Sequence, residues 1–147
     1  MTAAIPYART TCTCAECVRC CHDQPGSLIP GQLETIAEYL GQPVRVAALL
    51  FWASPGALVG NTTTGQTYRI GTITPRLKAG RCVFLSADDR CTIHAVAPAG
   101  CALFDTHMSA KDAQPIGLWM ARAQADAAYQ SLRRTLRPAD RSRPRRY

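Results

Sequence analysis

Cysteine is the residue type that stands out in this chain, because five of its eight cysteines lie within ten residues near the amino-terminal end. The eight are Cys12, Cys14, Cys17, Cys20, Cys21, Cys82, Cys91 and Cys101. Thiolates bind zinc and hold iron–sulfur clusters, and oxidised thiols form disulfides. The sequence therefore points either to metal chemistry or to a disulfide framework.

Disulfides are the less favoured interpretation. Small disulfide scaffolds are secreted and contain more than about 8–10% cysteine, whereas eight cysteines in 147 residues amount to about 5%. Residues 1–11 contain no apolar run of the kind that a secretory signal needs, so we expect a cytoplasmic protein with reduced thiols. Four cysteines within residues 14–21, ending in an adjacent pair, also suit a shared metal better than separate bridges.

The spacing Cys14-x2-Cys17-x2-Cys20 suits two kinds of metal centre. Two intervening residues let a tight loop direct neighbouring sulfurs at one ion, as in zinc sites. The same run holds three corners of a [4Fe–4S] cluster in bacterial ferredoxins, and the fourth ligand comes from elsewhere. The cofactor is therefore zinc or iron. Eight cysteines, with His94 three residues after Cys91, exceed one four-ligand site, so either two metals are bound or one is surrounded by spare thiols.

A longer pattern resembles a known family. It consists of Cys14-x2-Cys17-x2-Cys20-Cys21, Gly80-Arg81-Cys82-Val83-Phe84-Leu85, Cys91-Thr92-Ile93-His94 and Pro98-x2-Cys101. This pattern spans about residues 12–108 and resembles the CxxCxxCC family of YkgJ-like cysteine-cluster proteins, which is described as a zinc- or iron-chelating domain. The resemblance implies metal chelation and carries no particular reaction with it.

The residues of this pattern that could bind metal form the expected site. The expected ligands are Cys14, Cys17, Cys20, Cys21, Cys82, Cys91, Cys101 and His94. Cys12 lies outside the pattern and is the cysteine least expected to bind. His107, two residues after Asp105, could complete a site near Cys101, but we favour a surface or capping pair. His22 is expected to face solvent.

Several functions are compatible with such a site. The leading hypothesis is a metal-binding protein engaged in metal handling, or one that uses the metal structurally. The first alternative is an iron–sulfur protein with an electron-transfer or accessory catalytic role. No Ser/His/Asp order or glycine-rich phosphate loop is visible in the sequence, so whether the protein is an enzyme stays open. No window approaches about 18 consecutive apolar residues, so no membrane partner is expected.

The net charge of +7 comes mainly from the carboxyl-terminal end. This end contains Arg133, Arg134, Arg137, Arg141, Arg143, Arg145 and Arg146. These arginines could neutralise phosphates, which makes a nucleic-acid- or ribosome-associated zinc protein the second alternative. We favour a solvated helix end followed by a flexible basic tail over residues 138–147, because no aromatic residues or base-reading module accompany the charge.

The elements that must position these residues follow from periodicity and from turn residues. We expect helices over 30–41 and over 43–53, the second with Val46, Leu49, Leu50 and Trp52 turned inward. Strands are expected over 57–59, 67–70, 81–85 and 90–94, and one helical turn over 98–104. Residues 72–75 could extend the second strand. A last helix over 115–136 presents Leu118, Ala121, Ala125, Tyr129, Leu132 and Leu136 as one apolar stripe.

Together these elements predict a small single α+β domain over residues 1–137. It has N-terminal helices, a short antiparallel sheet and a long C-terminal helix around a cysteine-ligated metal site.

Overall fold

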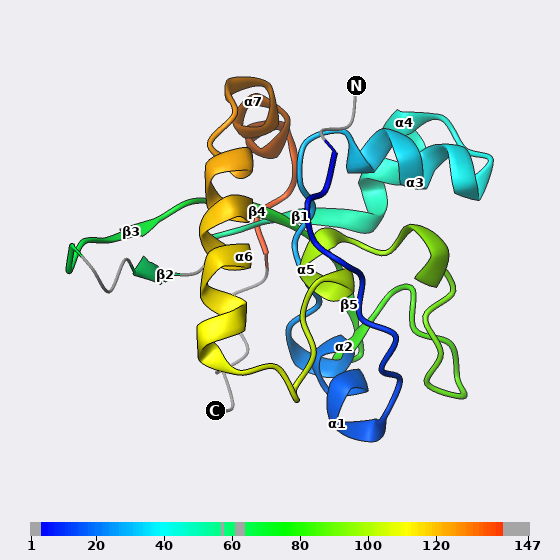
Figure 1. Ribbon diagram of the computed structural model, residues 1–147. Coiled ribbons are helices and arrows are strands. Elements are labelled where there is room, and N and C mark those ends of the chain that lie inside the picture. The colour runs from blue at the N-terminus through cyan, green and yellow to red at the C-terminus, as the bar shows by residue number, and fades with distance from the viewer. Residues whose placement is uncertain (1–3, 57, 61–63, 140–147) are drawn as a thin grey trace.

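Short helices and short antiparallel strand pairs make up the chain in the computed structural model, which describes residues 4–56, 58–60 and 64–139 (Figure 1). The helices are α1 (Ala15–Val18), α2 (Cys20–Asp23), α3 (Gln32–Leu40), α4 (Val44–Ala47), η1 (Ala48–Leu50), η2 (His94–Val96), α5 (Ala99–Ala102), α6 (Ala110–Gln124) and α7 (Ala127–Thr135). The strands are β1 (Phe51–Ser54), β2 (Leu58–Gly60), β3 (Thr67–Arg69), β4 (Thr72–Pro75), β5 (Leu77–Lys78) and β6 (Arg81–Cys82). The predicted small α+β domain is confirmed.

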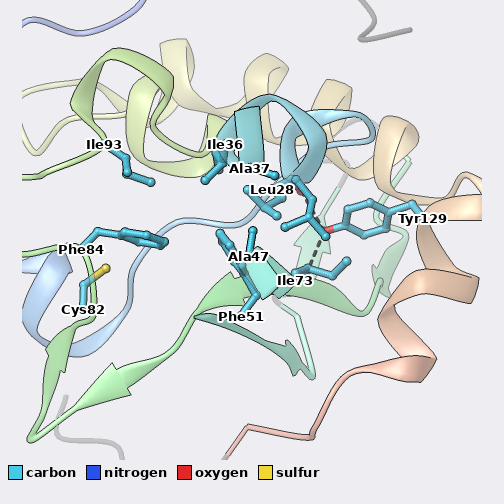
Figure 2. Packing of buried hydrophobic residues seen from close by; sticks show 11 residues of the cluster. Leu28, Ile36, Ala37, Ala47, Phe51, Ile73, Cys82, Phe84, Ile93 and Tyr129 are labelled. Carbon is cyan, nitrogen blue, oxygen red and sulfur yellow. Dashed lines mark hydrogen bonds between the residues drawn. The ribbon is translucent and has the colours of Figure 1, made fainter. Parts of the chain in front are cut away.

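The β1–β4 pair contributes to the larger of two clusters of buried side chains. Phe51 of β1 and Ile73 of β4 are 2% and 0% exposed, and they pack with Leu28 and with Ile36 of α3 (Figure 2). The ring of Phe51 also lies 5.6 Å from that of Phe84, measured between centroids. Burying each large apolar side chain stabilises the fold by about 1.5–3 kcal/mol, so this cluster is its main support.

The helix predicted over 43–53 is shorter than expected. The chain leaves the helical conformation after Leu50, and Phe51 begins β1, which pairs antiparallel with β4. The indole N–H of Trp52 donates to the hydroxyl of Thr74 directly opposite (3.0 Å). Strand pairing with the β-branched run of β4 therefore outweighs the local helical pattern.

The predicted inward face of this segment was also wrong in part. Val46 and Leu49 are exposed, at 39% and 67%, whereas Ala47 is fully buried. By contrast, α3 matches its prediction closely, and Gly41 ends it with a left-handed backbone (φ 64°) that favours glycine.

The helix predicted over 115–136 is two helices. The hydroxyl of Ser109 accepts a hydrogen bond from the Asp112 backbone N–H and starts α6 five residues before Pro115. The carboxylate of Asp126 accepts one from the Tyr129 N–H (3.0 Å) and starts α7. Such N-caps satisfy backbone donors that otherwise lack partners at a helix start, so each cap sets a boundary that periodicity alone does not show.

Helix α7 packs against the β1–β4 pair. The buried hydroxyl of Tyr129 donates to the Leu28 carbonyl and accepts from the Ile73 N–H, both at 2.8 Å (Figure 2). The guanidinium of Arg133 donates to the carbonyls of Ser54 and Thr72. After the helix, the backbone of residues 137–139 pairs with Ala53 on the edge of β1.

The strands predicted over 57–59 and 67–70 are confirmed, within the described residues, as the antiparallel pair β2–β3. Residues 72–75 form β4, a separate strand that pairs with β1. The strands predicted over 81–85 and 90–94 are reduced to β6, which pairs with β5, and to a single bridge between Leu85 and Cys91. Residues 94–96 form η2, and the helical turn expected over 98–104 is α5.

The amino-terminal segment, residues 4–14 (the N-terminal arm), runs alongside α5 towards α1 (Figure 1). The guanidinium of Arg9 donates to the carbonyls of His94 and Ala95, and the Thr10 N–H donates to the Ala102 carbonyl (2.7 Å). Tyr7 packs edge-to-face on Trp119 in the second, smaller buried cluster, which joins α5 to α6. Within the described residues, no helix has the length and apolar character needed to span a membrane.

Candidate metal centre

Four potential metal ligands meet where the N-terminal arm and α1 approach the loop between α5 and α6. They are Cys12, Cys14, Cys17 and His107, whose ligand atoms all lie within 4.8 Å of one another. The Sγ of Cys14 is 3.3 Å from the Nε2 of His107. The three cysteines are partly buried and His107 is exposed. In the part of the chain that the structure describes, no other group of three or more Cys, His, Asp or Glu ligands is as close.

The cysteines of this group come from one short stretch of backbone. Cys14 is extended (φ −66°, ψ 162°) and caps α1, and its carbonyl accepts the Val18 N–H (3.1 Å). Cys17 lies one helical turn after Cys14, and residues three apart share a helix face. The C-x2-C spacing therefore folds as the sequence predicts, with two sulfurs directed to one place.

A carboxylate connects the arm to the loop. One oxygen of Asp105 accepts the His107 N–H (2.9 Å), and the other accepts the Thr10 hydroxyl (2.8 Å). The same Thr10 oxygen accepts the Cys12 N–H (3.2 Å). The Thr10 hydrogen bond is the main cause of a lowered pKa of the Asp105 carboxyl. Asp105 thus holds Cys12 and His107 in place although it is not itself in the ligand group.

Hydrogen bonds among the thiols of this group shift the pKa values of Cys12 and Cys14. The backbone N–H of Cys17, followed by hydrogen bonds from the thiols of Cys12 and Cys17, lowers the pKa of Cys14. The backbone N–H of Cys14 lowers the pKa of Cys12, but its hydrogen bonds to the other two thiols outweigh this and raise that pKa to about 11. The group therefore combines a Cys14 thiol that loses its proton more readily than usual with a Cys12 thiol that keeps it, and an incoming metal would displace the Cys12 proton.

Three thiolates and an imidazole are a common tetrahedral ligand set for zinc. With Zn–S bonds of about 2.3 Å and Zn–N bonds of about 2.0–2.1 Å, the ligand atoms of a tetrahedral site are about 3.3–3.8 Å apart. The observed group needs to close only slightly to reach that spacing. A [4Fe–4S] cluster bonds each cysteine to a different iron, so it needs ligands that are further apart.

The predicted ligand set is only partly brought together. Cys14 and Cys17 belong to the group, and Cys20 is exposed outside it. The other predicted cysteines lie elsewhere: Cys21, Cys82, Cys91 and Cys101. All eight cysteines are free thiols, so no pair forms the disulfides of the alternative framework. Ligation by these remaining cysteines stays a prediction.

The histidines are placed differently from the sequence interpretation. His94 is exposed and outside the group, and its backbone carbonyl accepts a hydrogen bond from Arg9. The predicted capping pair is present, because the Asp105 carboxylate accepts the His107 backbone N–H. The imidazole of His107 also belongs to the ligand group, which the capping prediction did not include. Cys12 joins the group as well. Its proximity in sequence to Cys14 was the only signal for it.

The arginine cluster divides into two parts. Arg133 is partly buried, and its guanidinium donates hydrogen bonds to strand carbonyls. The Arg134 guanidinium donates to the Ser131 hydroxyl (3.3 Å). Residues 140–147, with four of the seven arginines, lie outside the described residues. The flexible tail and its nucleic-acid binding therefore stay predictions.

Comparison with known proteins gives one match. No curated protein and no solved structure matches the chain. Residues 13–116, most of the chain, match the CxxCxxCC family, described as "Putative zinc- or iron-chelating domain". The match starts one residue after Cys12 and includes His107. With four metal-ligand side chains gathered at one place and a family match over most of its length, this metal-binding protein belongs to the CxxCxxCC family.

Proposed function

We propose that the protein binds one exchangeable zinc ion through Cys12, Cys14, Cys17 and His107, and that it serves in metal handling. The observation that carries the proposal is the convergence of four ligand atoms within 4.8 Å. The mixed sulfur and nitrogen set and its close spacing favour a single zinc ion over a polynuclear iron centre.

Exposure supports the exchange of the ion. A zinc site with four protein ligands leaves no open coordination position, so exchange requires that a competing ligand reach the protein ligands themselves. Here His107 is exposed, and none of the four ligands belongs to either buried hydrophobic cluster. A chelating partner can therefore approach the ion directly, and loss of the ion leaves the buried core intact.

Metal analysis of the full chain tests this site. We expect the variant carrying Cys14→Ser and His107→Ala to contain one zinc equivalent less than the wild-type protein while keeping its circular dichroism spectrum. Cys20→Ser is the matched control, because Cys20 belongs to the same sequence run but lies outside the group. Equal zinc content in the double variant and the wild type would reject the site.

The identity of the metal is tested on protein purified without oxygen. Colourless protein that contains zinc, and gives it up rapidly to a soluble chelator, agrees with the proposal. Brown protein absorbing near ~400 nm, with iron and sulfide that the double variant loses, would replace it with the iron–sulfur alternative.

A further inference from the structure

We propose that Cys21, Cys82, Cys91 and Cys101 form a second, closed metal centre for a thiophilic metal, separate from the site at Cys12. The proposal goes beyond the exchangeable zinc site and does not depend on it. It rests on how four distant segments deliver these sulfurs to one part of the interior.

The first two cysteines meet because α2 packs against β6. Cys21 lies in α2, and Cys82 is the last residue of β6. Cys82 is 8% exposed beside Phe84 in the larger hydrophobic cluster (Figure 2), and Cys21 is a partly buried residue that packs against the same cluster. Both thiols therefore face the protein interior rather than the exposed zinc site.

The third cysteine is brought back by the chain that follows β6. Cys91 bridges to Leu85 and packs against the same cluster. At the tip of this loop, the Asp89 carboxylate accepts a hydrogen bond from Arg81 (2.8 Å) and lies 3.6 Å from the Nε2 of His22, next to Cys21. These contacts hold the loop against α2, so Cys91 stays on the side of Cys21 and Cys82.

The fourth cysteine arrives through a close contact between two backbones. A Cβ built on Gly26 would lie 2.1 Å from the carbonyl carbon of Gly100, so the two backbone segments leave no room for a side chain between them. The Gly26 N–H donates to the Sγ of Cys101 (3.1 Å). Such N–H donors stabilise thiolate ligands in metal sites. The contact therefore both places this sulfur and prepares it to carry negative charge.

The electrostatics agree that the four sulfurs share one environment. Burial, and then the charges of Cys82 and Cys91, raise the pKa of Cys21 to about 11. Burial is also the main cause of the raised pKa of Cys101, to which Cys21, Cys82 and Cys91 all contribute. A single buried cysteine behaves as a small apolar residue, but four interacting thiols form an all-sulfur donor set.

The donor set indicates the class of metal. All-sulfur sites select zinc or iron over magnesium and calcium, which prefer oxygen ligands. The four sulfurs are less tightly grouped than the first site, so a single ion would have to draw them together, whereas a polynuclear iron centre bonds each sulfur to its own iron. Both occupants, a single metal ion and a polynuclear iron centre, would be held by the same four thiolates, and the experiment below distinguishes them.

Cadmium-113 NMR of the reconstituted full chain tests the second centre without any mutation. We expect two bound cadmium equivalents and two resonances, the four-sulfur one further downfield than the one with three sulfurs and a nitrogen. Cys14→Ser with His107→Ala should remove only the latter, and Cys21→Ser only the former. If Cys21→Ser fails to fold, the wild-type spectrum still decides.

The outcomes separate the two sites. A wild-type spectrum without a four-sulfur resonance overturns the second centre, whatever happens to the first. A wild-type spectrum that has the four-sulfur resonance but lacks the one with three sulfurs and a nitrogen would overturn only the exchangeable zinc site. Iron and sulfide that persist in Cys14→Ser with His107→Ala, and disappear in Cys21→Ser, support the second centre with an iron–sulfur cluster as its occupant.

Discussion

Asp105 shows how much the exposed zinc site depends on residues that do not bind the ion. Its two carboxylate oxygens hold the His107 backbone and the Thr10 hydroxyl, so the arm and the loop approach each other through this one side chain. Outer partners of this kind orient metal ligands, and their loss typically lowers metal affinity by about 10–100-fold.

We therefore expect Asp105→Ala to weaken zinc binding by about 10–100-fold, because Cys12 and His107 lose their common support. Competition with a coloured chelator measures the change. Asp88→Ala is the control, since the Asp88 carboxylate likewise accepts a hydrogen bond from a neighbouring hydroxyl, but it is exposed and lies outside the site. Equal losses in both variants would show that Asp105 has no special role.

The affinity of the zinc site should rise with pH. The pKa of Cys12 is raised to about 11, so this thiol is protonated at neutral pH and the ion must displace its proton. Each proton released adds up to about tenfold in affinity per pH unit below the pKa of its thiol. Titrations between pH 6 and pH 8 in two buffers with different ionisation enthalpies measure both quantities. An affinity independent of pH would contradict the use of Cys12.

At the scale of the elements, Tyr129 links α7 to two other segments. Tyr129→Phe leaves the buried Ile73 N–H without its partner, so we expect a loss of about 1–3 kcal/mol in unfolding free energy. Tyr39→Phe is the control, because Tyr39 is 52% exposed. Chemical denaturation of the three proteins measures the difference.

The pH dependence of stability provides a second test of Tyr129. Burial raises its pKa above the usual value, so the folded chain favours the protonated phenol. Its contribution is complete below about pH 10, the ordinary tyrosine pKa, and is lost as pH rises above that value. The wild-type protein should therefore lose more stability than Tyr129→Phe between pH 9 and pH 11.

Two glycines in helices should respond to alanine in opposite directions. A Cβ on Gly100 would lie 2.4 Å from the Ser27 backbone nitrogen, so Gly100→Ala would push two backbone segments apart. This change should destabilise the fold by about 2 kcal/mol or more. Gly117 in α6 has open space around it, so Gly117→Ala should stabilise by about 0.5–1 kcal/mol. Thermal unfolding of both variants checks the signs.

The elements that the sequence predicts best are those with strong local signals. Gly41 ends α3 as expected, and the strands predicted on either side of residue 64 pair as β2 and β3. The break before α7 was missed because the apolar stripe continues on both sides of it. A single N-cap residue, Asp126, marks the start of the new helix. The strand at Phe51 was missed because its partner β4 lies 18 or more residues further on, and local periodicity carries no such information.

At the scale of the whole molecule, zinc should stabilise the fold by mass action. A ligand that binds only the native state adds about 2.7 kcal/mol when its free concentration is 100 times its Kd. We expect zinc to raise the melting temperature of the wild-type protein more than that of Cys14→Ser with His107→Ala. Equal shifts would mean that the exposed group does not bind the ion.

The sequence predicts a cysteine-based metal site but not its composition. Local spacing identifies Cys14 and Cys17, which are one helical turn apart. It cannot identify His107, because that residue reaches Cys14 only through the course of the arm along α5 and through the Asp105 hydrogen bonds. The family resemblance leaves the same gap, since its pattern does not include Cys12.

The contact between Gly26 and Cys101 joins residues that are 75 positions apart, which also has a consequence for biosynthesis. Contacts between such distant residues form late, since a long stretch of chain must first be closed into a loop. As the polypeptide leaves the ribosome, Cys21 is made well before Cys101 and waits in a nascent chain with its thiol unprotected. Oxidation of Cys21 should therefore occur mainly in newly made chains rather than in mature ones.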